Sequence, residues 1–350
     1  MSKILLMGAY PPPVGGNSVH IQRLKRLLDS DEGSQCNVLD IYSSENGDYL
    51  KDVIRVGPPG IMSIFKAIFY IRSYKPDILH IHVSAMGKFL YIGFFILLFT
   101  SQKTHKIITI HSGSFVKKCK LYGSVKMFLT IILLRKFNKV IAVSDEQKQF
   151  LMTKGISEGL ISVLPAYIPT YLEKSVYLDS KVKEFRKEYN KILISSGYGV
   201  PLYGFDKIIP LINFQSEFED EIGLIICLYN TYDESYIEKI QSQISDQNRV
   251  IIFKDLSPEE FSFLLKSSDV YVRATDRDGD AVAIREANHF NIPVLASDVV
   301  QRPVYCTLFE LSSDVSLRQG LAEIFNRDAH YLANEDVDSI LLKYKRIYGI

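Results

Sequence analysis

The sequence predicts an α/β protein with two doubly wound parallel-sheet domains that face a central cleft. Short β-branched or apolar runs alternate with amphipathic segments of helical length along the chain, a pattern typical of βαβ units. The chain has 350 residues, 47% of them hydrophobic, a length that favours two domains over one. Ligands of such sheets collect at the carboxyl ends of the strands, so a shared site is expected between the domains.

In the first half, apolar runs predict six strands, and the amphipathic segments between them predict five helices. The strands are expected at residues 3–8, 36–41, 77–82, 106–111, 139–144 and 160–164. The helices are expected near residues 18–29, 61–74, 85–100, 119–136 and 145–154.

The alternation stops between Pro165 and about Lys191, which indicates a linker and a lead-in helix, and then resumes. Strands are expected at residues 191–196, 223–228, 249–253, 270–274 and 293–297, and later helices near 316–326 and 335–347. The predicted organisation is a first domain at 1–165, a linker at 166–190, a second domain at 191–330 and a C-terminal helix at 331–350.

The composition favours an intracellular protein. Cys36, Cys119, Cys227 and Cys306 are far apart and form no CxxC pair, which indicates free thiols in a reducing cytoplasm. The N-terminus suits a first strand better than a secretory signal. The most apolar run, Phe89–Phe99, is about half of the roughly 20 residues that a membrane-spanning helix needs, so a buried or interfacial helix is expected.

Charge is distributed unevenly. Cut near Pro165, the chain has 21 Lys/Arg and 11 Asp/Glu before the cut, and 20 and 29 after it. The first half is therefore expected to face an anionic membrane surface or a phosphorylated substrate.

The segment Arg273–Asp298 combines a strand, a loop, a helix and a strand. The loop contains Asp278, Gly279 and Asp280, and the helix, expected to begin near Asp280, carries Glu286 two turns in. Free N–H groups at the helix start would bind a diphosphate, and Glu286 would accept ribose hydroxyls. The alternative is an Asp-capped helix with a solvated glutamate.

This segment resembles the signature of retaining GT-B glycosyltransferases of family four, which have two Rossmann-like domains. The resemblance lies in two acidic residues eight positions apart, in Glu286-Ala287, and in the run from Ile292 to Asp298. It implies that Asp278, one methylene shorter than the family glutamate, contacts the donor sugar. It also implies that Glu286 holds the nucleotide ribose.

Three further positions follow from the resemblance. Gly15 and Gly16, in a loop whose helix is expected to start with Asn17 or Ser18 as N-cap, would line the cleft across from the donor, unless they only serve a turn. His111, at the end of the fourth strand, would contact the transferred sugar. His80 is expected to be a core residue satisfied by backbone, His82 is open between the two roles, and no function is assigned to His20, His105, His289 or His330.

One departure affects the diphosphate. Tyr198 and Tyr203 stand where the family usually has an arginine and a lysine. We expect Arg273, with Arg285 as a second candidate, to supply the missing charge. The alternative for each is a surface arginine that pairs with a neighbouring aspartate.

The resemblance implies retaining, metal-independent sugar transfer from a UDP- or GDP-linked donor, without a cofactor. No His or carboxylate cluster has metal-ligand spacing. A basic region flanks the apolar run Met127–Leu134, with Lys117, Lys118, Lys120 and Lys126 before it or at its start and Arg135, Lys136 and Lys139 after it. This pattern suggests peripheral contact with an anionic membrane. It also suggests a lipid-linked saccharide acceptor, as in bacterial surface polysaccharide assembly at the cytoplasmic face. No nucleic acid partner is expected. A nucleotide-sugar epimerase of the same fold and a catalytically silent binding subunit remain alternatives.

Overall fold

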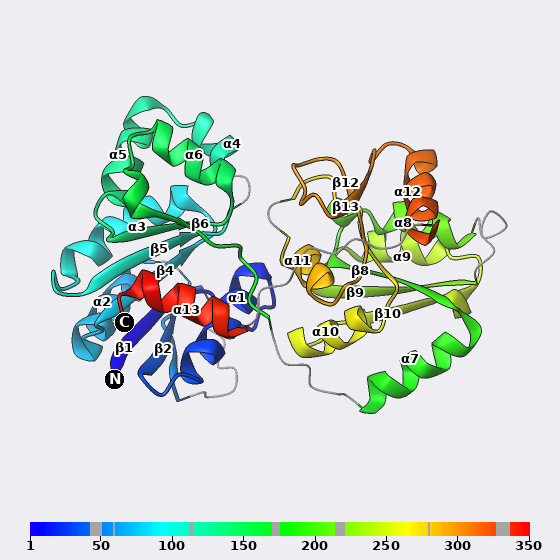
Figure 1. Ribbon diagram of the computed structural model, residues 1–350, viewed down its shortest axis with the longest axis horizontal. Helices are drawn as coiled ribbons and strands as arrows, with labels where there is room; N and C mark the ends of the chain where they lie inside the picture. Colours follow the sequence, from blue (N-terminus) through cyan, green and yellow to red (C-terminus); the bar gives the residue numbers. More distant parts are fainter. Residues whose placement is uncertain are drawn as a thin grey trace. The chain divides into compact units, whose positions relative to one another are not determined.

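The computed structural model describes residues 1–42, 51–58, 60–112, 115–169, 176–213, 221–278, 281–326 and 337–350, without the side chains of Lys88, Tyr91 and Val176. The chain divides into two compact units (Figure 1). The first contains residues 1–168 and 335–350, and the second contains residues 169–334. Each is a parallel sheet with helices on its faces, which confirms the predicted fold class.

The first unit is a seven-stranded parallel sheet in the order β3-β2-β1-β4-β5-β6-β7. Its strands are β1 (Ser2–Gly8), β2 (Ser34–Asp40), β3 (Val53–Arg55), β4 (Ile78–Val83), β5 (His105–Ile110), β6 (Lys139–Ala142) and β7 (Ile161–Val163). Its helices are α1 (Gly16–Asp29), α2 (Ile61–Tyr74), α3 (Met86–Phe99), α4 (Phe115–Lys120), α5 (Ser124–Leu134), α6 (Asp145–Thr153) and α13 (Val337–Tyr348). The order reverses at β1 and β4, and the carboxyl ends of these central strands form the ligand-binding edge in doubly wound sheets.

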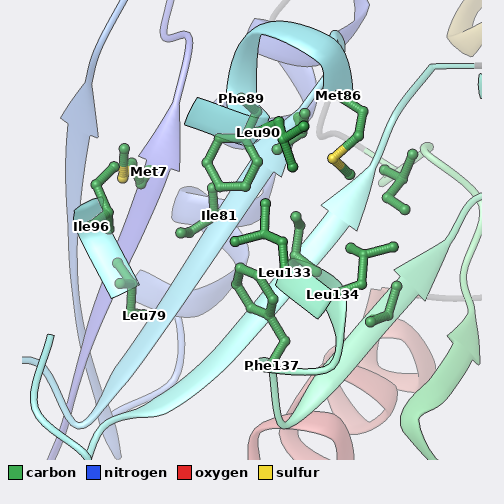
Figure 2. Close-up of a cluster of buried hydrophobic side chains, with 14 of the residues drawn as sticks. Met7, Leu79, Ile81, Met86, Phe89, Leu90, Ile96, Leu133, Leu134 and Phe137 are labelled. Atoms are coloured by element: carbon green, nitrogen blue, oxygen red, sulfur yellow. The ribbon is translucent and has the colours of Figure 1, made fainter. Parts of the chain in front are cut away.

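Alternate residues of the central strands serve two hydrophobic cores, as the period of two in a strand requires. Leu5 and Met7 of β1 belong to the core covered by α2, α3 and α5. Figure 2 shows part of this core, where Phe89 of α3 and Leu133 of α5 lie against Ile81 of β4. Ile4 and Leu6 belong to the core on the other face, under α1 and α13.

The last helix, α13, returns to the first unit, a placement that the sequence did not indicate. Ile340, Tyr344 and Ile347 enter the core shared with α1. The Tyr348 hydroxyl lies 2.8 Å from His80 Nδ1, and Lys345 Nζ lies 2.9 Å from Asp31 Oδ1. The end of the chain is thus part of the first unit's core.

The second unit is a six-stranded parallel sheet in the order β10-β9-β8-β11-β12-β13. Its strands are β8 (Lys191–Gly199), β9 (Ile222–Tyr232), β10 (Val250–Lys254), β11 (Val270–Arg273), β12 (Val294–Ser297) and β13 (Cys306–Phe309). Its helices are α7 (Val176–Glu188), α8 (Phe205–Asn213), α9 (Glu234–Ser242), α10 (Pro258–Lys266), α11 (Val282–His289) and α12 (Asp314–Asn326). Again the order reverses at two central strands, β8 and β11, which places the segment after β11 at the ligand edge.

Several predicted elements differ from the structure. The helix expected at 119–136 is two helices, because α4 ends at Lys120 and Gly123, with an extended backbone, is the N-cap of α5. The edge strands β3 and β13 were not predicted. The lead-in helix exists as α7, which packs against α10 in the second unit. Every helix in the described ranges is too short or too polar to cross a bilayer.

Candidate functional site

The loop after β11 leads to α11, which begins at Val282 with Ala281 as N-cap. Gly279 and Asp280, both predicted to bind the donor, lie outside the described residues. Because the helix begins later than expected, Glu286 is its fifth residue, one turn in rather than two. Ala281 has no side-chain acceptor, so it leaves the first-turn N–H groups without the cap that an aspartate would supply.

Asp278 is the centre of a buried ion cluster. Arg273 donates to both of its carboxylate oxygens, from Nε and Nη2 at 3.0 Å each. Arg302 Nη1 donates to Asp278 Oδ2 at 2.7 Å, and Thr275 Oγ1 lies 3.3 Å from the same oxygen. The side chains of Arg302 and Asp278 are 2% and 8% exposed. The carboxylate is therefore engaged by protein groups on several sides.

The two guanidinium groups determine the ionisation of this cluster. Burial alone would raise the pKa of the Asp278 carboxyl, but Arg273 and then Arg302 hold it well below its usual range. Burial would lower the pKa of Arg273, and Asp278 raises it instead. With both arginines and the aspartate charged, the cluster has a net charge of +1, which favours a bound anion.

Arg302 is a site residue that the sequence analysis missed. Its Nε donates to the Ser297 carbonyl at 3.0 Å, and the Ser297 hydroxyl donates to the Thr275 carbonyl at 2.7 Å. These contacts fix the loop after β12 against the loop after β11. No spacing in the sequence indicates this pairing, because Arg302 and Asp278 are 24 positions apart.

Tyr203, one of the two tyrosines at positions where an arginine and a lysine were expected, lies beside Arg273. The Tyr198 and Tyr203 rings are 5.3 Å apart, and the Arg273 guanidinium lies 5.1 Å from the centre of the Tyr203 ring. A side chain at Gly197 would collide with this ring, since an added Cβ would lie 1.9 Å from it. Burial raises the pKa of Tyr203, so the ring is a neutral support for the arginine. Arg273 thus brings a cation next to Tyr203, the position at which the resemblance implied a lysine.

Glu286 is buried on the inner side of α11. Its exposed fraction is 2%, and its Oε1 accepts a hydrogen bond from the Ser262 hydroxyl of α10. The Tyr229 hydroxyl lies near enough to sense this glutamate: burial raises its pKa most, and Cys227 and Glu286 raise it further. The solvated glutamate that was the alternative is therefore wrong.

Arg285 and Arg302 both act on the thiol of Cys306, at the start of β13. Burial raises the pKa of Cys306 to about 12, and both arginines act against this shift. Their positive charges therefore lie near this thiol, at the start of β13.

In the first unit, α1 starts one residue after Gly15, which is its N-cap in an extended conformation. The prediction of Asn17 or Ser18 as N-cap was wrong, because Ser18 is the third helical residue. Its hydroxyl accepts from the Gly15 N–H at 2.9 Å and donates to the Pro13 carbonyl at 2.8 Å, so it ties the loop to the start of the helix. Gly15 and Gly16 thus lie at the start of α1, after β1, with no left-handed backbone that would require glycine.

His111 follows β5 and meets two other histidines. Its Nε2 lies 2.9 Å from His82 Nδ1, and its ring centre is 4.6 Å from that of His20 on α1. His80 lies deeper, with its two nitrogens 2.8 Å from the Tyr348 hydroxyl and 2.7 Å from the Thr109 hydroxyl. It is a core residue as expected, although hydroxyl groups satisfy it rather than the backbone.

Burial determines the ionisation of the cluster of His20, His80, His82 and His111. It lowers the pKa of His20 to about 4 and that of the other three well below the ordinary value. The imidazoles are therefore neutral near pH 7, and His111 can exchange a hydrogen bond with a sugar hydroxyl without carrying a charge.

Acid should destabilise the first unit for the same reason. Because these pKa values lie below the unfolded value of about 6.5, the unfolded chain binds protons first, and stability falls as the pH falls from 6.5 toward the folded values. His20 alone should contribute about 2 kcal/mol of lost unfolding free energy between pH 7 and pH 5. Urea unfolding at the two pH values measures this loss. His20→Gln should reduce it, and His289→Gln in the second unit should not; equal losses in all three proteins would contradict the assignment.

Three of these histidines could also hold a metal. One nitrogen from each of His20, His82 and His111 lies within 4.8 Å of the others, and neutral imidazoles are zinc ligands. The sequence showed no histidine cluster at metal-ligand spacing, because these three residues come from α1, β4 and the end of β5 and meet only in the fold. Nδ1 of His82 already makes a hydrogen bond with His111, whereas His82 Nε2 is buried without a hydrogen-bond partner among the described residues.

Comparisons with known proteins agree with this architecture. Residues 14–170 match the model of Glycosyltransferase Family 4. Sucrose-phosphate synthase from Thermosynechococcus elongatus has a TM-score of 0.74 and 15% identity, with 100% of this chain and 98% of that chain covered. No curated protein sequence matches the chain.

Two other solved structures are similar in fold. The Anabaena protein HepE in complex with UDP-glucose has a TM-score of 0.65 and 15% identity, with both chains fully covered. UDP-GlcNAc 2-epimerase from Methanocaldococcus jannaschii has a TM-score of 0.66 and 12% identity, with 98% and 99% covered. The first unit thus matches Glycosyltransferase Family 4, and the whole chain has the two-domain α/β fold of GT-B enzymes.

Proposed function

We propose that the protein is a retaining glycosyltransferase of the hexosyltransferase type, which moves a sugar from a UDP- or GDP-linked donor to a saccharide acceptor. The acceptor is lipid-linked, the reaction belongs to polysaccharide biosynthesis, and the enzyme works at the cytoplasmic face of a membrane. The observation that carries the proposal is the buried carboxylate of Glu286, which lies one turn into α11. The N-cap residue of this helix, Ala281, has no side-chain group that could accept from the first-turn N–H groups. The family match and the nucleotide-sugar ligand of HepE support it.

The second unit supplies the groups that a donor requires. Glu286 accepts the ribose hydroxyls, and the first-turn N–H groups of α11 bind the diphosphate together with Gly279 and Asp280. The positive potential at this edge comes from Arg273, Arg302 and Arg285. In the ion cluster two arginines pair with the single negative charge of Asp278, so one positive charge is left over. Asp278 therefore positions two arginines, and its contact with the donor sugar is indirect.

The proposed reaction needs little acid or base chemistry from the protein. The bond between the sugar anomeric carbon and the phosphate oxygen breaks, and the acceptor oxygen bonds to that carbon on the same face. The acceptor proton passes to the departing phosphate. The protein stabilises the phosphate charge and orients both substrates. His111 hydrogen-bonds the transferred sugar, and Gly15 and Gly16 line the acceptor side.

Two alternatives have direct tests. An epimerase, which the similarity to UDP-GlcNAc 2-epimerase favours, converts the donor to a new sugar isomer without an acceptor; incubation with the donor alone followed by chromatography detects it. A silent binding subunit would show no heat of binding with UDP, GDP or their sugars while remaining folded. Binding of one nucleotide, with sugar transfer and no isomer, supports the glycosyltransferase.

We expect transfer to be independent of metal. Dialysis against EDTA should change the rate by less than about twofold, because protein cations and helix N–H groups stabilise the leaving group. Metal analysis of the dialysed protein is the control for complete removal. A large loss of rate, restored by zinc and absent in a His20→Gln variant, would assign the reaction to the histidine cluster instead.

A further inference from the structure

We infer that the outward face of α2, α3 and α5 is a docking surface for an anionic lipid bilayer. On α2, Ile61, Phe65 and Phe69 are 75%, 65% and 76% exposed, at intervals of four residues. The same helix directs Ala67 and Ile71 into the core. Residues four apart share one face of a helix, so the outer side of α2 presents an aromatic stripe to solvent.

The neighbouring helices extend this surface. Phe95 and Leu98 of α3 are 55% and 75% exposed, and Val125 and Phe128 of α5 are 73% and 65% exposed. Because α3 packs against both α2 and α5, the three outer faces form one layer over the core shown in Figure 2. The run Met127–Leu134, predicted to contact lipid, mostly faces that core, since Ile131, Leu133 and Leu134 are buried.

The exposed phenylalanines are confined to one region. Within the described part of the chain, every exposed phenylalanine lies on these three helices, at positions 65, 69, 95, 99 and 128. Among the described residues of the second unit, the exposed large hydrophobic residues are Tyr177 on α7, Val304 and Leu308 at or just before β13, and Val315 on α12, none of them a phenylalanine. Isolated exposed residues are ordinary on soluble proteins, whereas contiguous apolar patches indicate a binding surface.

The positive charge around this surface favours an anionic partner. Residues 61–134 contain ten Lys or Arg and one acidic residue, Asp77, whose carboxylate accepts from the Lys3 N–H. Lys66 on α2 and Lys117, Lys118 and Lys120 on α4 are exposed. Aromatic side chains flanked by lysines fit the interface of a bilayer with anionic headgroups, where both the apolar and the charged groups find partners.

A pocket between α3 and α5 adds a second feature of lipid contact. It measures about 370 Å³ and is lined by Leu90, Gly123, Ser124, Val125, Lys126 and Leu129. Lys126 Nζ lies 4.0 Å from the centre of the Tyr122 ring. An acyl chain would meet the apolar lining here, and the ammonium group would meet the headgroup phosphate.

The inference deepens the proposed function, because a lipid-linked acceptor would be reached from this surface, but vesicle binding tests it without any transfer. The full chain should float with vesicles of phosphatidylcholine and 30% phosphatidylglycerol, and at least tenfold less with phosphatidylcholine alone. Phe65→Ser with Phe69→Ser, and separately Val125→Ser, should weaken binding, the double variant at least tenfold. Val304→Ser, an equally small change at an exposed valine of the second unit, should not.

Three outcomes would overturn the inference. These are no binding of the unmodified chain to anionic vesicles, equal binding by the phenylalanine variants, or light scattering that shows a dimer which the double variant converts to a monomer. The last would assign the surface to a second copy of the chain. Calorimetric binding of UDP and GDP separates this inference from the proposed function, since the phenylalanine variants should keep nucleotide binding whichever result the vesicles give.

Discussion

Asp278→Asn should lower the unfolding free energy of the second unit by about 3–5 kcal/mol, because it leaves Arg273 and Arg302 buried without their shared counter-charge. A loss of this size corresponds to a fall in melting temperature of roughly 6–20 °C. Differential scanning calorimetry near pH 7 measures it. The comparable removal of a surface charge, Asp179→Asn in the Lys183 pair of α7, should cost less than about 1 kcal/mol.

The pH dependence of the unfolding free energy tests the same prediction in a second way. A carboxyl whose folded pKa is depressed stabilises the protein above its unfolded pKa of about 3.9, and this contribution is lost as the pH falls further. The difference between the unmodified protein and Asp278→Asn should therefore shrink below about pH 4. A variant with an unchanged melting temperature at pH 7 would show that the cluster does not depend on this charge.

Glu286→Gln should weaken nucleotide binding by about 10- to 100-fold, because hydrogen bonds to a charged group contribute about 1.5–3 kcal/mol. Sugar transfer should fall by at least about 100-fold, since the donor is then also misplaced. Glutamine keeps the size of the side chain and an oxygen that accepts from the Ser262 hydroxyl, so the fold should remain intact. Calorimetry with UDP and GDP, and a transfer assay, measure the two effects.

The control is Glu238→Gln, at an exposed position of α9 in the same unit. It should bind nucleotide and transfer sugar at normal rates. Wild-type turnover in Glu286→Gln would remove this residue from the site, whereas a lowered melting temperature with the same loss of activity would assign it a structural role.

The fold could be predicted from the sequence because its signal is local. Each buried strand of a parallel sheet is a continuous apolar run, and in each covering helix apolar residues recur every three or four positions. The alternation of the two patterns therefore specifies βαβ units. The break between α4 and α5 depended on Gly123, inside a run that otherwise has a helical period.

The site was predictable only where its residues are close in sequence. The segment Arg273–Asp298 identified the helix of Glu286 and the loop of Asp278 together. The pairing of Asp278 with Arg302, and the contact of His20 with His82 and His111, depend on elements that meet only in the folded sheet. The same holds for the phenylalanines of α2 and α3, whose exposure is decided by which side of each helix the core covers.

A crystal structure with a bound nucleoside diphosphate tests the central claim most directly. We expect a ribose hydroxyl within hydrogen-bonding distance of the Glu286 carboxylate, and the diphosphate against the first turn of α11. A nucleotide bound elsewhere, with the Glu286 carboxylate still held only by protein groups, would contradict it.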